Sequence, residues 1–131
     1  MAGNITNYLE NELLDHTLKV GAAFGQPSYC KLALFKSDPT DTGDVTNEVS
    51  GGAYARQNVV FTAASGGSTS NDADVTFPQA TADWGTITHI GIMDATTAGN
   101  MLWHGQLTAP KTVASGDTFK IPTADLDISL D

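Results

Sequence analysis

The first hydrophobic pattern along the chain has the period of an α-helix. It is formed by four leucines, Leu9, Leu13, Leu14 and Leu18. Asn7 precedes the pattern as a candidate N-cap, and Glu10 follows three residues later, which is the spacing of a capping box. Gly21 is a natural stop, because glycine readily adopts the backbone conformation found after a helix. We therefore predict a helix over residues 7–20, preceded by an N-terminal arm of residues 1–6.

From residue 29 onward the period changes to two, which is typical of β-strands. Six segments are predicted strands: Tyr29–Phe35, Tyr54–Phe61, Ala73–Phe77, Thr86–Met93, Met101–Leu107 and Thr118–Ile121. A seventh, over residues 126–130, alternates leucine or isoleucine with aspartate or serine, which predicts three inward apolar side chains. Short strands with turn signals about every 8–12 residues predict an all-β fold, a β-sandwich or jelly-roll with one N-terminal α-helix.

The sequence shows no internal repeat and no linker. Residues 1–131 are therefore expected to form one domain, with the arm first, the helix next and the strands over residues 29–131.

The charge balance narrows the possible partners. Fifteen acidic and six basic residues give a net charge of −9, and no lysine or arginine cluster offsets it. Nucleic acids and anionic membranes repel such a surface, so neither is expected as a partner. The sequence shows no signal peptide and no apolar run near the roughly 18 residues that span a bilayer, which predicts a soluble protein made in the cytoplasm.

The residues that could carry chemistry form no recognisable catalytic or metal-binding pattern. Asp38, Asp41 and Asp44 lie in a turn-rich loop whose spacing does not match a calcium-binding loop, so a turn is favoured over a weak cation site. His89 and His104 fall on strands predicted to pair, but two imidazoles without a third ligand make a poor zinc site.

Nucleophilic catalysis is also disfavoured. The sequence has neither a nucleophile elbow nor a phosphate-binding loop. Its single cysteine, Cys30, cannot form an internal disulfide, and it lies in an apolar strand, where a buried and unreactive thiol is usual. We therefore expect no enzymatic activity and no cofactor.

Aromatic residues and isolated polar residues are candidate contacts with other subunits, because Trp, Tyr and Arg dominate protein interfaces. The candidate interface residues are Ile5, Tyr8, His16, Tyr54, Arg56, Trp84, His89, Trp103 and His104. Arg56 falls beside Tyr54 on one side of a strand, which suits a buried ion pair, a subunit contact or core packing. As an alternative of another class, Trp84 and Trp103 would form the stacking platform of a carbohydrate-binding module. That hypothesis requires both indoles to be exposed.

Seven segments, taken in order, resemble a known family: Asn7–Glu10, Leu13–His16, Leu32–Phe35, Asp38–Asp41, Glu48–Gln57, Gly85–Ile92 and Gly116–Phe119. They are similar to small virion proteins of tailed bacteriophages, which are often labelled tail fibre proteins. The resemblance covers nearly the whole chain. It implies a non-enzymatic structural component of the virion that is made in the host cytoplasm.

Two positions on the virion are compatible with this resemblance. Because the sequence has no fibrous repeat, we favour a capsid cement or decoration protein that braces neighbouring capsid subunits. The alternative is a tail fibre or tail-tip protein involved in host attachment. Either role implies a homo-oligomer, with a trimer expected, and contact with the major capsid protein or with tail proteins. Residues 1–6 are expected to serve attachment.

Overall fold

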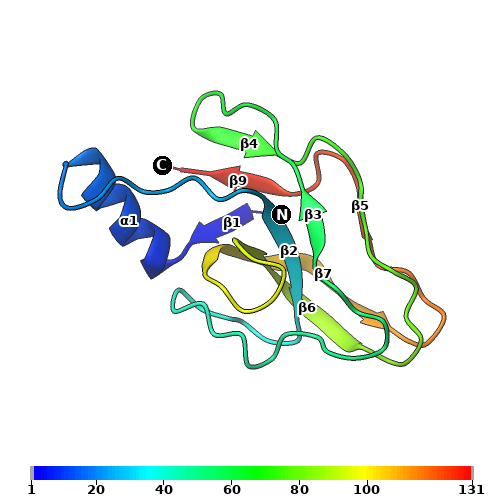
Figure 1. Ribbon diagram of the computed structural model, residues 1–131. Helices are drawn as coiled ribbons and strands as arrows, with labels where there is room; N and C mark the ends of the chain where they lie inside the picture. Colours follow the sequence, from blue (N-terminus) through cyan, green and yellow to red (C-terminus); the bar gives the residue numbers. More distant parts are fainter. Residues whose placement is uncertain (1, 131) are drawn as a thin grey trace.

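The structure is a computed structural model that describes residues 2–130. Within this range the chain forms one α-helix and nine strands (Figure 1). Their bounds are β1 Ala2–Ile5, α1 Asn7–Thr17, β2 Cys30–Phe35, β3 Gln57–Val59, β4 Ser68–Ser70, β5 Val75–Thr76, β6 Gly85–Met93, β7 Met101–Val113, β8 Lys120–Ile121 and β9 Asp127–Ser129. The prediction of an all-β protein with one N-terminal helix is confirmed.

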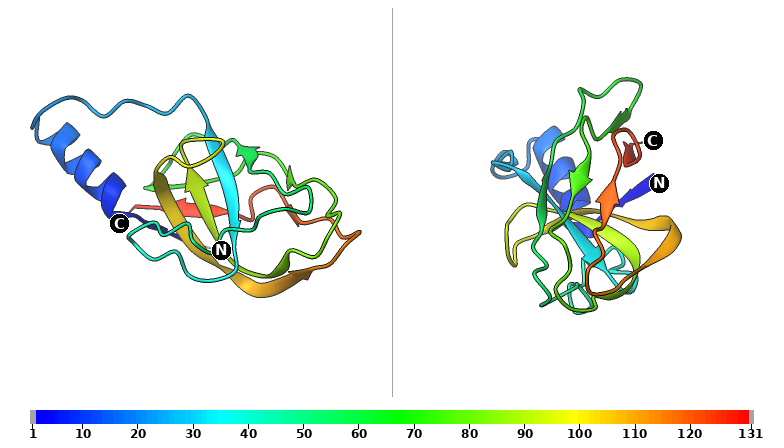
Figure 2. Two further views of the ribbon diagram at one scale, coloured as in Figure 1. Left: turned by 60° about the horizontal axis from the view of Figure 1, so that its bottom comes forward. Right: turned by 90° about the vertical axis from the view of Figure 1, so that its right-hand side faces the viewer.

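Seven of the strands form one strongly curled sheet in the order β3-β2-β6-β7-β1-β9-β4. Its two edges meet just beyond β3 and β4. Phe61 and Asn71 form a β-bridge there, and the Thr62 amide donates to the Ser70 carbonyl at 2.9 Å. The sheet thus wraps around its own core, as Figure 2 shows. β5 and β8 form a separate two-stranded sheet. The two facing layers of the predicted β-sandwich arise mainly because one sheet curls onto itself.

Aromatic side chains fill the centre of the core. Tyr54, Phe77, Trp84 and Phe119 lie in contact, with ring centroids 5.5 to 6.3 Å apart and mostly edge-to-face geometry. Trp84 is only 2% exposed, and its indole N–H donates to the Gly52 carbonyl at 2.8 Å. Edge-to-face aromatic pairs add to the stabilisation that burial provides, so this cluster is a main anchor of the fold.

Two strands differ in length from the prediction. β3 is limited to residues 57–59, because Tyr54 and Arg56 before it bind Glu48 instead of pairing in the sheet. β7 continues past Leu107 to Val113. It can do so because its register against β6 shifts opposite the stretch that contains Pro110, a residue that cannot donate a ladder hydrogen bond.

The predicted N-terminal arm is wrong, because residues 2–5 form a strand inside the sheet. β1 pairs antiparallel with β7, with Asn4 opposite His104, and parallel with β9, with Gly3 opposite Ile128. A Cβ atom added to Gly3 would lie 2.6 Å from Cδ1 of Ile128, so glycine allows the close approach of β1 and β9. The short stretch of small and polar residues carries no alternation that would reveal a strand.

The helix also begins differently from the prediction. Its N-cap is Thr6, not Asn7, and Glu10 takes no part in a capping box. The Thr6 hydroxyl accepts a hydrogen bond from the Leu9 amide at 3.4 Å and donates to the Met101 carbonyl at 2.6 Å. Pairing of β1 with β7 places Thr6 over the start of β7, and this tertiary contact selects the cap.

The helix ends at Thr17, earlier than the predicted stop at Gly21. Leu18 is the C-cap, and Lys19 adopts a left-handed conformation with a φ of 61°. Leu9 is the single buried residue of α1. Figures 1 and 2 show the helix projecting from the sheet, with the loop over residues 18–29 returning to β2.

Candidate functional site

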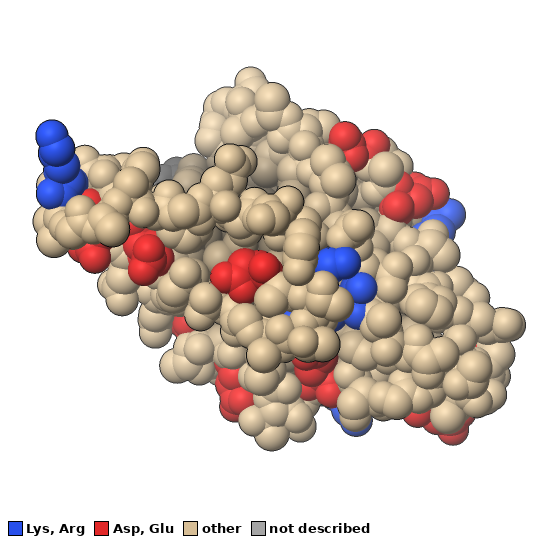
Figure 3. Space-filling model, viewed as in Figure 1, with Lys and Arg blue, Asp and Glu red and all other residues tan. Residues whose placement is uncertain are grey.

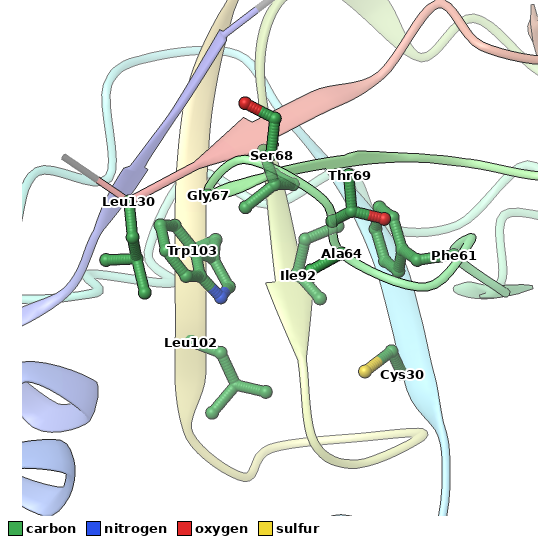
Figure 4. A pocket seen from close by; sticks show the side chains of 11 residues that line it. Cys30, Phe61, Ala64, Gly67, Ser68, Thr69, Ile92, Leu102, Trp103 and Leu130 are labelled. Atoms are coloured by element: carbon green, nitrogen blue, oxygen red, sulfur yellow. The ribbon is translucent and has the colours of Figure 1, made fainter.

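An apolar groove opens on the curled sheet beside α1. It has a volume of about 320 Å³, and all eleven residues that line it are uncharged. Its large side chains come from β2, β6, β7, β9 and the neighbouring loops (Figure 4): Cys30, Phe61, Ile92, Leu102, Trp103, Ile128 and Leu130. The Thr6 amide donates to the Leu102 carbonyl at 3.1 Å, so the start of the helix is fixed next to the groove.

The walls of the groove combine an indole, a thiol and an exposed leucine. Trp103 and Cys30 face the same space from different strands (Figure 4). Burial raises the pKa of the Cys30 thiol, and the negative charge of Asp94 adds to this effect, so the thiol stays protonated near neutral pH. Leu130, predicted to point inward, is 54% exposed and lies on the rim of the groove. The groove therefore offers an uncharged, apolar surface.

A second exposed apolar surface lies on α1. Leu14 is 56% exposed and Leu18 is 69% exposed, and Val20 follows them in the loop at 57%. Leu14 comes five residues after the buried Leu9, which places it about 140° around the helix axis. The four leucines therefore do not form the single buried stripe that we predicted, and two of them face solvent.

Carboxylates border these exposed leucines, which form the outer strip of α1, because Glu10 lies four residues before Leu14 and Asp15 three residues before Leu18. On a helical projection Glu10 and Asp15 fall on either side of Leu14 and Leu18. On the face of the molecule in Figure 3, charged groups form small separate clusters with uncharged surface between them. The groove is thus an uncharged area on a strongly acidic protein, whereas the outer strip of α1 is apolar with acidic borders.

Arg56, a candidate interface residue, is instead the centre of a buried network. Its guanidinium binds both carboxylate oxygens of Glu48, with Nε and Nη2 at 2.8 and 2.7 Å. Its Nη1 donates to the carbonyls of Ala95 and Ala98 at 2.9 and 2.8 Å. The hydrogen bond to Glu48 raises the pKa of Arg56. Of the interpretations left open by the sequence, the buried ion pair is the one the structure contains.

Tyr54 joins the same network. Its hydroxyl donates to Glu48 at 2.7 Å and accepts from the Leu34 amide at 3.0 Å. Burial raises the pKa of Tyr54 far above its ordinary value. Both hydrogen-bonding functions of the phenol are satisfied within the chain, so Tyr54 supports the fold and has no free group for a partner.

His104 holds the acidic loop against the sheet. The side chain is buried, its Nε2 lies 2.8 Å from Asp41 Oδ1, and its Nδ1 lies 3.7 Å from Asp38 Oδ1. The Asp41 carbonyl also accepts from the Asn7 amide at 2.9 Å. The loop is thereby connected to both β7 and the start of α1.

The remaining acidic and imidazole groups form turns and local contacts. Asp44 accepts from the amide and hydroxyl of Thr46, and these bonds lower its pKa. His89 lies opposite Gln106 rather than opposite His104, and its ring nitrogen is 2.8 Å from the Thr88 hydroxyl. In the part of the chain that the structure describes, no group of three or more His, Cys, Asp or Glu side chains is arranged to hold a metal ion.

The hypothesis that Trp84 and Trp103 form an exposed stacking platform is wrong. Trp84 is buried in the aromatic core, whereas Trp103 is half-buried in the groove wall. The two residues face different surroundings, because Trp84 precedes β6 and Trp103 lies within β7. This arrangement removes the basis for a carbohydrate-binding module built on the two side chains.

The other candidate interface residues lie around the helix. Ile5 pairs with Trp103 across β1 and β7 and is half-buried. Tyr8 is half-buried, and burial is the main cause of its raised pKa. His16 is exposed, and its Nδ1 accepts from the Phe24 amide at 3.2 Å, which fixes the returning loop to the helix.

Most groove residues carry no sequence signal for a shared site. Trp103 is a candidate interface residue, but Cys30, Phe61 and Leu130 are apolar positions of three separate predicted strands. The strands that bear these residues meet only when the sheet curls, and a sequence pattern does not report that curvature. The exposed position of Leu14 had a usable signal, namely its spacing of five from Leu9.

A family model described as podophage GP4 fiber I protein gp80 matches residues 4–129. No curated protein matches the sequence. Among residues 2–130, no helix has both the length and the apolar character needed to cross a bilayer. The match confirms the resemblance to small phage virion proteins of the tail fibre type and covers every strand except the first residues of β1. The chain therefore belongs to the family of the podophage GP4 fiber I protein gp80.

Proposed function

We propose that the protein is a structural subunit of a phage tail fibre and works by assembling with neighbouring subunits. The observation that carries this proposal is the pair of exposed apolar surfaces, the uncharged groove and the outer strip of α1. Exposed apolar patches on a soluble protein commonly mark contacts with other proteins. The family, whose name describes a fibre protein, supports the same role.

The contacts of the polar residues support a role without catalysis. Arg56, Glu48 and Tyr54 bind one another and nearby backbone groups, and His104 binds the loop that carries Asp41. A general base or nucleophile must reach a substrate. These groups instead hold loops on the sheet, which suits a structural subunit.

We propose further that the protein forms a homo-oligomer, with a trimer expected, and that its other partners are proteins of the same virion. The net charge of −9 favours neither nucleic acid nor an anionic membrane as a partner. It also keeps the outer surface of an assembled particle soluble.

A capsid cement or decoration protein is the second candidate function. The observation that favours it is the compact shape: the strands close around one core, without the repeated elements of an elongated fibre. The family name favours the fibre, so we place it first.

Imaging of intact virions at side-chain resolution tests the proposal. We expect density for the curled sheet, with Trp84 and Phe77 in its core, within a fibre attached to the tail. If the same density lay on the outer capsid shell, the cement role would be supported in place of the fibre role. Purified virions that lack the protein altogether would overturn both.

A further inference from the structure

We infer that a pocket beside the ion pair of Arg56 and Glu48 binds a small neutral ligand rich in hydroxyl groups, namely one sugar ring. The pocket has a volume of about 340 Å³ and lies between the segment that contains these two residues and the loop that joins β6 to β7. Neither Trp84 nor Trp103 lines it, so the site does not require exposed indoles. Binding of such a ligand is a function separate from the proposed assembly.

One guanidinium holds the walls of the pocket in place. Arg56 binds Glu48 in the loop between β2 and β3, and its Nη1 donates to two carbonyls of the loop between β6 and β7. The second loop is also closed on itself, because the Asn100 amide donates to Asp94 Oδ1 at 2.7 Å. A pocket whose walls are fixed before binding loses little conformational freedom when the ligand enters.

The ion pair keeps one donor and one acceptor that can face a ligand. A guanidinium carries about five N–H groups. Within residues 2–130, Glu48 and the two loop carbonyls use all of those on Arg56 except one N–H on Nη2. Of the carboxylate oxygens, Oε2 accepts from both Arg56 and Tyr54, whereas Oε1 accepts from Arg56 alone and keeps a lone pair. Both members of the pair line the pocket.

Exposed hydroxyl groups line the pocket as well. Ser50 and Thr97 belong to the two different loops, and both side chains are exposed. Their hydroxyls form no hydrogen bond within the part of the chain that the structure describes, so both are available to a ligand. Val49, Ala55 and Ala98 supply apolar surface between the polar groups. A mainly apolar lining with a few convergent polar groups is typical of small-molecule sites.

The charges of the pocket favour a neutral ligand. An anion is disfavoured, because the negative charges of Glu48 and Asp94 both act on Arg56 and the chain has a net charge of −9. A cation has no acceptor for the free N–H of Arg56. An apolar ligand would cover the free donor and the free acceptor without pairing them, which is costly. Each hydroxyl of a sugar can donate and accept, so a sugar pairs both groups without adding charge.

The size of the pocket matches one sugar ring. An apolar cavity of about 150 Å³ holds benzene, and a hexose has about twice as many non-hydrogen atoms. The pocket, at about 340 Å³, is larger than that cavity by a similar factor. A ligand this small makes few contacts, so we expect a dissociation constant on the order of 1 mM.

Titration of the ¹⁵N-labelled protein, followed by NMR, tests the site. The probes are D-glucose, D-galactose, L-rhamnose and myo-inositol, each up to about 50 mM. We expect at least one probe to shift the amide signals of Ser50, Gly51, Thr97 and Ala98 in a saturable way. Maltotriose beside D-glucose distinguishes the end of a glycan chain from a free sugar, because a chain can gain contacts outside the pocket. If no probe gave saturable shifts at these residues, the inference would be overturned.

Variants with an intact ion pair assign the binding to this pocket. Thr97→Val removes one hydroxyl and should weaken binding at least about fivefold, which follows from the loss of one hydrogen bond. Ala55→Phe fills the pocket and should abolish the shifts. Thr108→Val, at an exposed position of β7 outside the pocket, is the matched control and should bind like the wild type. Equal affinity of Thr97→Val and Thr108→Val would overturn the inference. Virion imaging tests the fibre role by itself, so a failure of sugar binding leaves that role standing.

Discussion

Arg56 and Glu48 form a bidentate ion pair in which the arginine side chain is 4% exposed and the glutamate side chain 15% exposed. The pair joins the segment before β3 to the loop after β2. The remaining donor of Arg56 reaches two carbonyls of the loop between β6 and β7. Three segments distant in sequence are thus held by one guanidinium.

Loss of Arg56 should therefore be severe. We expect Arg56→Ala to lower the free energy of unfolding by about 3–5 kcal/mol, because it leaves the Glu48 carboxylate buried without a partner. Adding Glu48→Gln should recover part of this loss, because the unpaired charge is then gone. Urea denaturation of the single and double variants measures both effects. Equal stability of Arg56→Ala and wild type would show that the pair is not structural.

Tyr54 should make the protein sensitive to high pH. Its pKa is raised in the folded state, whereas an unfolded tyrosine ionises near pH 10. The contribution of Tyr54 is therefore fully present below about pH 10 and declines as the pH rises above it. The free energy of unfolding should fall more steeply between pH 9 and about 11 in the wild type than in Tyr54→Phe. Parallel curves for the two proteins would contradict this assignment.

The N-terminal strand should be required for folding. Deleting residues 2–6 removes the partner of β7 and β9 and the cap of α1, so we expect loss of the cooperative thermal transition. Gly3→Ala should cost about 1 kcal/mol, because the Ile128 side chain has to move to accept the added methyl group. Asn4→Ser, at an exposed position on the same strand, is the control. A truncated protein with an unchanged melting temperature would restore the idea of a free arm.

Cys30 should react slowly with thiol reagents. Its thiol has a raised pKa and lies in the groove, so both the thiolate fraction and the access are reduced. We expect labelling by a disulfide reagent at pH 7 to be at least tenfold slower than in urea. Trp103→Ala, which opens the wall of the groove, should speed up the reaction, whereas the core variant Val75→Ala serves as a control. Rapid labelling of the native protein would argue against a sheltered thiol.

The strand content was predictable where the local pattern was strong. The alternation in β9 and the apolar segment of β2 identified strands that the structure contains. β1 was missed because its position between β7 and β9 depends on Gly3 meeting Ile128, a contact between distant segments. The same limit applies to the cap of α1, where the carbonyl of Met101 selects Thr6 over Asn7.

Burial of single aromatic residues was less predictable. Trp84 lies between Asp83 and Gly85, whereas Trp103 follows the apolar Leu102, yet Trp84 lies in the core and Trp103 in a groove wall. The difference arises from the curl of the sheet, which brings Phe61 and Leu130 to the side where Trp103 lies. The groove could therefore not be predicted from the residue patterns within single strands.

The parallel pairing of β1 with β9 has a consequence for biosynthesis. β1 ends at Ile5 and β9 begins at Asp127, so β1 finds this neighbour only after all the intervening residues have been translated. Contacts between such distant segments slow folding, because a long loop must close before they form. Until then one edge of β1 is unpaired in the nascent chain. We therefore expect host chaperones to matter most while this protein is being translated.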